Sequence, residues 1–216
     1  KEGLFMNHSV VLTIARQYGS GGRDIGNRVA ELLSIPHYDK ELISMAAKDG
    51  DMDEKIVERV DEVASGSLLY SIAMGTGLVG VNPASKFTMP LNDRLFVHQT
   101  QVIKELAQKG SCVIIGRCAD YVLKDFPGRI SIFLYGDMEH RRARIAERHS
   151  ISEKEAEALI LKTDKKRATY YNFYTGEKWG KFENYHLSLS TSLLGMEESA
   201  QLIAQIVRKK MEQLSE

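Results

Sequence analysis

Short apolar runs recur along the chain and predict buried strands. Four of these runs are Val10–Ala15, Ser111–Ile115, Arg129–Tyr135 and His186–Ser190, and a weaker fifth run is Ile35–Tyr38. Runs that are apolar on both faces are typical of a parallel sheet covered by helices on both sides. We therefore expect a buried parallel sheet.

Helical patterns follow most of these strands. The expected helices are Arg23–Ser34, Lys40–Lys48, Asn92–Gln108, Met138–His149, Ser152–Arg167 and Met196–Gln213. Ser152 and Glu155 form a capping-box pattern, which favours a helix start at that point. The alternation of strands and helices predicts a doubly wound α/β domain with three layers.

One stretch, from residue 49 to residue 90, interrupts this alternation. It contains an acidic helical piece, Asp51–Val63, and a glycine-rich apolar piece, Leu68–Val81. We interpret it as an insertion within a single domain over residues 1–216. Met6 is the expected natural start, with Lys1–Phe5 as an upstream segment.

The composition narrows the function classes. The chain has 216 residues, of which 43% are hydrophobic, enough for one domain with a sizeable core. Charged residues balance to a net charge of zero, so nothing indicates nucleic-acid binding. No apolar run approaches the roughly 18–20 residues of a membrane helix, and the first ten residues lack the apolar region of a signal peptide.

Cysteines and histidines give no sign of a metal site. Cys112 and Cys118 lie six positions apart without a CxxC pattern, which fits free thiols in the cytoplasm. The six histidines are scattered and show no ligand spacing. We therefore expect no structural metal, no membrane partner and a cytoplasmic protein, and the sequence indicates no oligomeric state.

A glycine-rich turn follows the first strand and opens the first helix. It contains Gly19, Ser20, Gly21 and Gly22. Glycines at such a turn let backbone N–H groups point at an anion, and the helix N-terminus adds partial positive charge. Arg23 lies in the first helical turn, where a cation is unfavourable unless a phosphate binds nearby.

Three interpretations of this turn stay open. The first is a variant of the P-loop G-x-x-x-x-G-K-[ST], with Arg16 at the first glycine, Gly22 at the lysine and Arg23 as the nearest substitute cation. The second is a dinucleotide-binding fingerprint, with Asp24 at its third glycine and Asp39 near its acidic position. The third is a turn without a ligand.

Arginines gather in three further places. Arg117 follows the third strand, where ligands bind in open α/β sheets, and it could hold a phosphate or pair with Asp120. Arg141, Arg144 and Arg148 share one helical face, which would neutralise phosphoryl charge or face solvent. The third place is the pair Asp164 and Arg167, three positions apart on a helix, which is either part of the site or a surface ion pair.

These motifs, in this order, resemble the cytidylate kinase-like family of bacterial P-loop proteins over nearly the whole chain. The segments that carry the resemblance are Ile14–Gly26, Pro36–Ile43, Ile114–Asp120, Asp164–Arg167, Tyr170–Tyr171 and Ser190–Gly195. The resemblance implies a three-layer α/β/α P-loop NTPase-like fold with a parallel five-stranded sheet in the order 2-3-1-4-5. It also implies a helical insertion, and a basic helix and lid over residues 138–180.

The resemblance further implies a kinase that uses ATP and Mg²⁺ on a small nucleotide acceptor such as CMP. The implied ATP-binding residues are Gly19, Ser20, Gly21, Gly22, Arg23, Asp24, Arg141 and Arg144. The implied acceptor-binding residues are Tyr38, Asp39, Arg117, Asp164 and Arg167. The expected catalytic residues are Arg23, Arg117 and Arg167.

The chain departs from the family pattern at two positions. Gly22 replaces the P-loop lysine, and Ile115 replaces the aspartate of an Asp-Gly-Arg motif whose arginine matches Arg117. A nucleotide-binding sensor that has lost catalysis therefore remains an alternative, as does an NAD-dependent oxidoreductase that uses the same loop.

Overall fold

The computed structural model describes residues 9–53 and 90–215. The chain divides into two units, one formed by Lys1–Asp39 with Ile103–Glu216 and the other by Lys40–Val102. Met6 and almost all of the expected insertion over residues 49–90 lie outside the described residues. The first unit, called the sheet unit below, contains all five strands.

The strands form one parallel sheet. They are β1 (Val11–Arg16), β2 (His37–Tyr38), β3 (Cys112–Ile115), β4 (Arg129–Tyr135) and β5 (Leu187–Ser190). Their order is β2-β3-β1-β4-β5, and every neighbouring pair is parallel, which confirms the expected order. Because the strands are parallel, their carboxyl ends meet at one edge of the sheet.

The helices lie where the apolar periodicity places them. Their bounds are α1 (Gly22–Leu33), α2 (Glu41–Asp49), α4 (Leu91–Lys109), α5 (Ala119–Val122), α6 (Met138–His149), α7 (Glu153–Thr175), α8 (Thr191–Leu194) and α9 (Met196–Ser215). A 3₁₀ turn spans Phe182–Asn184. All six expected helices are present, and the Ser152–Glu155 capping box is formed. Within the described residues, no helix has both the length and the hydropathy that crossing a membrane requires.

Helix α7 runs further than expected. The sequence predicts its end at Arg167, but the helix continues to Thr175 and ends at Gly176, whose φ of 70° is left-handed. The aromatic run Tyr170–Tyr174 therefore lies on a helix rather than in a loop. Tyr171 is the buried member of that run, so it packs inward.

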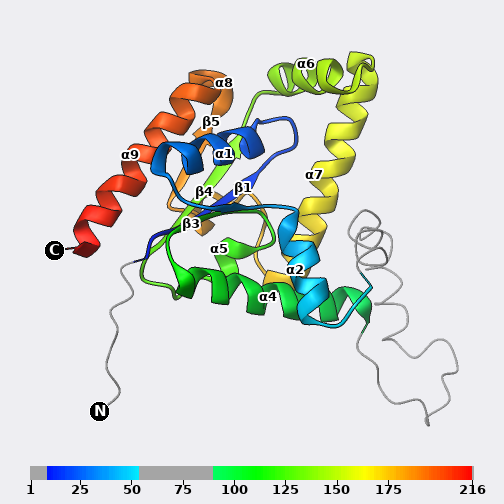
Figure 1. Ribbon diagram of the computed structural model, residues 1–216. Coiled ribbons are helices and arrows are strands. Elements are labelled where there is room, and N and C mark those ends of the chain that lie inside the picture. Colours follow the sequence, from blue (N-terminus) through cyan, green and yellow to red (C-terminus); the bar gives the residue numbers. More distant parts are fainter. Residues whose placement is uncertain (1–8, 54–89, 216) are drawn as a thin grey trace, which may run out of the picture. The chain divides into compact units, whose positions relative to one another are not determined.

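The sheet is covered on both faces. Figure 1 shows α1 and α9 on one side of the sheet and α5 on the other. Ile25 of α1 and Ile203 of α9 belong to the same buried cluster as Leu12, Ile14 and Ile132 of the sheet. Burial on both faces explains why these strands are continuous apolar runs.

The second unit has its own small apolar cluster. Ile43, Ala46 and Ala47 of α2 pack against Leu95 of α4. A hydrogen bond lies at the same junction, between His98 Nδ1 and Asp49 Oδ2 at 2.6 Å.

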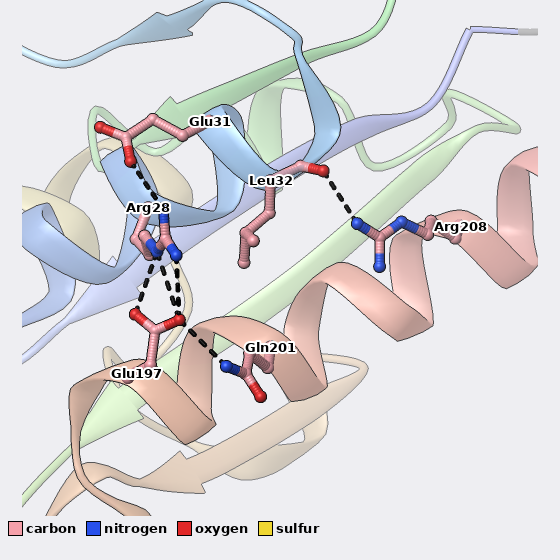
Figure 2. Close-up of polar contacts among 6 residues, drawn as sticks. All are labelled: Arg28, Glu31, Leu32, Glu197, Gln201 and Arg208. Carbon is pink, nitrogen blue, oxygen red and sulfur yellow. Dashed lines mark hydrogen bonds and ion pairs between the residues drawn. The ribbon is translucent and has the colours of Figure 1, made fainter.

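Polar contacts also join α1 to α9 (Figure 2). Arg28 Nε lies 3.0 Å from Glu197 Oε2, and Arg28 Nη1 lies 3.1 Å from Glu31 Oε2. Arg208 donates to the carbonyl of Leu32 at 2.8 Å. The Arg28 and Glu197 side chains are 44% and 46% exposed, so water screens the pair and its contribution to stability is small.

We therefore expect packing to hold α9 on α1. Ile203→Ala should lower the free energy of unfolding by about 2–5 kcal/mol, because it opens a cavity in the fully buried cluster. Glu197→Ala should lower the melting temperature much less. Thermal and urea unfolding of the two variants measure this difference, and equal losses would contradict it.

Candidate functional site

The glycine loop joins β1 to α1 at the carboxyl edge of the sheet. Gly19 and Gly21 have φ values of 82° and 79°, which are left-handed. A Cβ on Gly19 would lie 3.0 Å from the carbonyl oxygen of Arg141, so a side chain there would crowd α6. Gly21 is the N-cap of α1 and supplies no capping side chain. The first N–H groups of α1 therefore lack a side-chain cap and suit an anion.

An acidic residue of α7 fixes this loop. Asp164 Oδ1 accepts a hydrogen bond from the backbone N–H of Tyr18 at 2.7 Å. Asp164 Oδ2 accepts one from Arg141 Nη1 at 2.6 Å, and the same nitrogen donates to the carbonyl of Tyr18 at 3.2 Å. The peptide groups on both sides of Tyr18 are thus held from α6 and α7.

Asp39 holds two arginines together. Its Oδ1 lies 3.2 Å from Arg16 Nη2, and its Oδ2 lies 2.6 Å from Arg23 Nε. The Asp39 side chain is only 9% exposed. It directly follows Tyr38, the last residue of β2, whose pKa is raised by burial. The contact joins the ends of β1 and β2 to the start of α1.

Two further arginines lie close to this pair. Arg167 Nη1 donates to the carbonyl of Arg16 at 2.8 Å, and its guanidinium lies 5.5 Å from the centre of the Tyr18 ring. Burial lowers the pKa of Arg167, while Asp164 opposes the shift. The charge of Arg117 also lowers the pKa of Arg167 and that of Arg16.

Arg117 lies in an unusual stretch of backbone. Gly116, Arg117 and Cys118 have φ values of 77°, 60° and 55°, so three consecutive residues are left-handed. This conformation is costly for residues with a side chain. The backbone therefore changes direction sharply between β3 and α5. This turn lies at the carboxyl end of β3, which is the strand between β1 and β2.

We call the arginines at this edge the arginine cluster. The members are Arg16, Arg23, Arg117, Arg141 and Arg167. The carboxylates among them are Asp39 and Asp164. Among the described residues of this edge, arginines outnumber carboxylates, an arrangement that attracts an anion.

Burial and neighbouring charges both act on the pKa of Arg16. Burial, followed by the charge of Arg167, lowers the pKa of Arg16 to about 9, against the raising effect of Asp39. The positive charges of Arg117 and Arg23 also lower the pKa of Arg16, by smaller amounts. The guanidinium nevertheless stays charged at neutral pH.

The basic face of α6 points toward the loop and α1. Arg144 forms a short ion pair with Asp24 in the first turn of α1, and its Nη1 lies 2.8 Å from the Sδ of Met196. Arg148 lies 3.9 Å from Asp24 and is half exposed. Ser20 is buried, and its hydroxyl donates to the carbonyl of Gln17 at 2.9 Å. The structure thus brings Arg144 and Asp24 together beside the loop, and their binding of ATP stays a prediction.

The described residues at this edge of the sheet do not fit a protein-bound Mg²⁺. Arg23 occupies the Ser/Thr position of the P-loop motif, and buried Ile115 occupies the aspartate position before Gly116. Both oxygens of Asp39 face guanidinium groups. Asp120 is buried and accepts a hydrogen bond from the Tyr171 hydroxyl at 2.8 Å. The described part of the chain contains no group of three or more His, Cys, Asp or Glu side chains that could hold a metal.

Comparison with known proteins decides the family. The model of the cytidylate kinase-like family matches residues 11–193, most of the chain. The chain belongs to the cytidylate kinase-like family. No curated protein matches it.

Two solved structures share the fold of this cytidylate kinase-like family member. A protein of Eubacterium ventriosum is 28% identical, with a TM-score of 0.69, covering 92% of this chain and 98% of that one. A shikimate kinase of Bacteroides thetaiotaomicron is 12% identical, with a TM-score of 0.50, covering 93% of this chain and 99% of that one. The second likeness shows a shared fold.

One residue of this candidate site is not predicted as a site residue from the sequence. In the sequence Arg16 is only a departure from the P-loop pattern, yet its side chain pairs with Asp39 and feels the charges of three other arginines of the cluster. The sequence does contain a signal for this role, because Arg16 brings a cation to the first glycine position while Gly22 removes the cation from the lysine position.

We expect Asp120 to be a buried structural acid. Burial raises its pKa, although the hydrogen bond from Tyr171 opposes the shift. Since the folded pKa lies above the unfolded one, the ionised form costs stability at neutral pH, and this cost vanishes as the pH falls below the usual carboxyl range. Asp120→Asn should therefore raise the melting temperature at pH 7.5, with the gain shrinking toward pH 4.

Thermal unfolding between pH 4 and pH 8 measures this effect. Asp125→Asn is the matched control, because Asp125 is exposed, and it should change little. A gain from Asp120→Asn that grew as the pH fell would contradict the account.

Proposed function

We propose that this chain is an ATP-dependent phosphotransferase that acts on a small acceptor, with nucleoside monophosphates such as CMP as the first candidates. The observation that carries the proposal is the arginine cluster beside the uncapped N-terminus of α1. Membership of a kinase-like P-loop family supports it. ATP, supplied with Mg²⁺, is the proposed donor.

Phosphoryl transfer suits such a site because it depends on positioning and charge neutralisation rather than on covalent chemistry by the protein. The N–H groups of the loop and of α1 would bind the donor phosphates. Arg23, Arg117 and Arg167 would surround the transferred group and stabilise its charge. Asp164 and Arg141 already hold the loop, so little reorganisation is needed when the nucleotide binds.

The acceptor is proposed to lie on the β2 and β3 side of the cluster. Tyr38 and Asp39 end β2 there, and Arg117 follows β3 next to it. Arg117 offers a planar pair of donors to an acceptor phosphate. Contacts of Asp164 and Arg167 with the acceptor remain part of this proposal.

A nucleotide-binding sensor is the second candidate. Gly22 at the lysine position and the poor fit to a protein-bound metal favour it. Such a protein would bind ATP with no turnover on any acceptor.

Arg117→Ala should lower turnover by about a hundredfold or more, because arginines that stabilise phosphoryl-transfer charge contribute several powers of ten. Coupled assays over a panel of nucleoside monophosphates measure turnover. The control is Arg208→Ala on α9, which should keep full activity. Unchanged turnover in Arg117→Ala would remove Arg117 from the mechanism.

Nucleotide binding separates the remaining outcomes. Thermal shift with ATP–Mg²⁺ and with NAD tests the donor directly, because a ligand of the folded state raises the melting temperature. Binding of ATP without turnover on any acceptor would favour the sensor. A melting temperature that rises with NAD but not with ATP–Mg²⁺ would overturn the proposal that the chain is a kinase.

A further inference from the structure

The glycine loop differs from the standard P-loop at two positions, where the glycine and the cationic residue have changed places. The standard motif has glycine first and lysine sixth after it, whereas this chain has Arg16 first and Gly22 at the lysine position. One cation is thus lost from the loop, and another is gained six residues earlier. The structure shows that the two changes depend on each other.

The aliphatic part of the Arg16 side chain fills the space that a side chain at position 22 would need. A Cβ placed on Gly22 would lie 2.7 Å from both Cβ and Cγ of Arg16. These atoms lie close to the backbone and cannot swing aside as the end of a long side chain can. Arg16 and a lysine at position 22 therefore exclude each other.

The guanidinium of Arg16 reaches the end of β3. A Cβ on Gly116 would lie 2.0 Å from Arg16 Nη1, and the φ of Gly116, 77°, also disfavours a side chain. Two glycines, one in the loop and one after β3, thus make room for a single arginine. Its path runs from the glycine loop along the carboxyl edge of the sheet.

Among the described residues, Asp39 is the carboxylate that pairs with Arg16. Asp39 accepts from Nη2 of Arg16 and also binds Arg23. The Arg16 side chain is 17% exposed, so water solvates it little. Arg117, Arg167 and Arg23 all add positive charge around it. A bound polyanion would place negative charge beside this guanidinium and the arginines around it.

We propose that Arg16 is the phosphate-binding cation of this loop and replaces the ammonium of the standard lysine at the terminal phosphates of the donor. This inference rests on the proposed function for the identity of the donor. A guanidinium presents a planar pair of donors, so it can bind a phosphate in two places while its stem stays fixed over Gly22.

The test moves the charge back to its standard position. Arg16→Gly should weaken binding of ATP and of inorganic tripolyphosphate by about 10- to 100-fold, the range of a charge-assisted contact. Gly22→Lys alone should also weaken binding, because the new side chain collides with Arg16. The double variant Arg16→Gly/Gly22→Lys should bind both probes at least tenfold more tightly than Arg16→Gly.

Isothermal titration calorimetry measures the affinities, and thermal unfolding confirms that each variant is folded. Gly116→Ala provides a second route, since it displaces the guanidinium and leaves Arg16 in place. It should weaken binding of both probes as well. Arg208→Ala is the control and should bind like the wild type.

The outcomes separate the inference from the proposed function. Wild-type affinity for both probes in Arg16→Gly and in Gly116→Ala would overturn the inference and leave an ATP-binding function intact. Binding of tripolyphosphate but not ATP, with loss in Arg16→Gly, would support the inference and overturn the kinase. A wild-type protein that binds neither probe would overturn both.

Discussion

The site depends on one charged side chain that crosses the carboxyl edge of the sheet. Arg16 leaves the end of β1, passes over Gly22 and places its guanidinium beside Gly116 and Asp39. The residue types at positions 22, 116 and 39 each suit the position of this side chain. The two glycines leave the space, and the carboxylate offsets part of the charge. The remaining positive charge, which further arginines reinforce, makes the edge suited to a polyphosphate.

The parallel sheet gives this arrangement its geometry. Strands β1, β2 and β3 end side by side, so residues far apart in the sequence meet without long loops. The pair of Arg141 and Asp164 then clamps the peptide groups of Tyr18 from two helices. The loop is thus held in place by the protein itself, as preorganised binding of a nucleotide requires.

The sequence predicted the fold well and the site only in part. Continuous apolar runs predicted a buried parallel sheet, because such strands are covered on both faces. The order of the strands came instead from the resemblance to the cytidylate kinase-like family. Asp164 was interpreted as an acceptor ligand or a surface ion pair, and its bond to the N–H of Tyr18 spans 146 positions in the sequence. The role of Arg16 depends on the path of its side chain over Gly22, which no pattern of residue types specifies. The extent of α7 was underestimated because its aromatic run lacks a clear apolar stripe.

The central claim is that a guanidinium replaces the missing ammonium of the loop. A crystal structure of the protein with a non-hydrolysable ATP analogue tests it most directly. The account predicts that the terminal phosphates lie at the N-terminus of α1 and accept hydrogen bonds from the guanidinium of Arg16. Phosphates bound away from Arg16, with its guanidinium still directed only at Asp39, would contradict it.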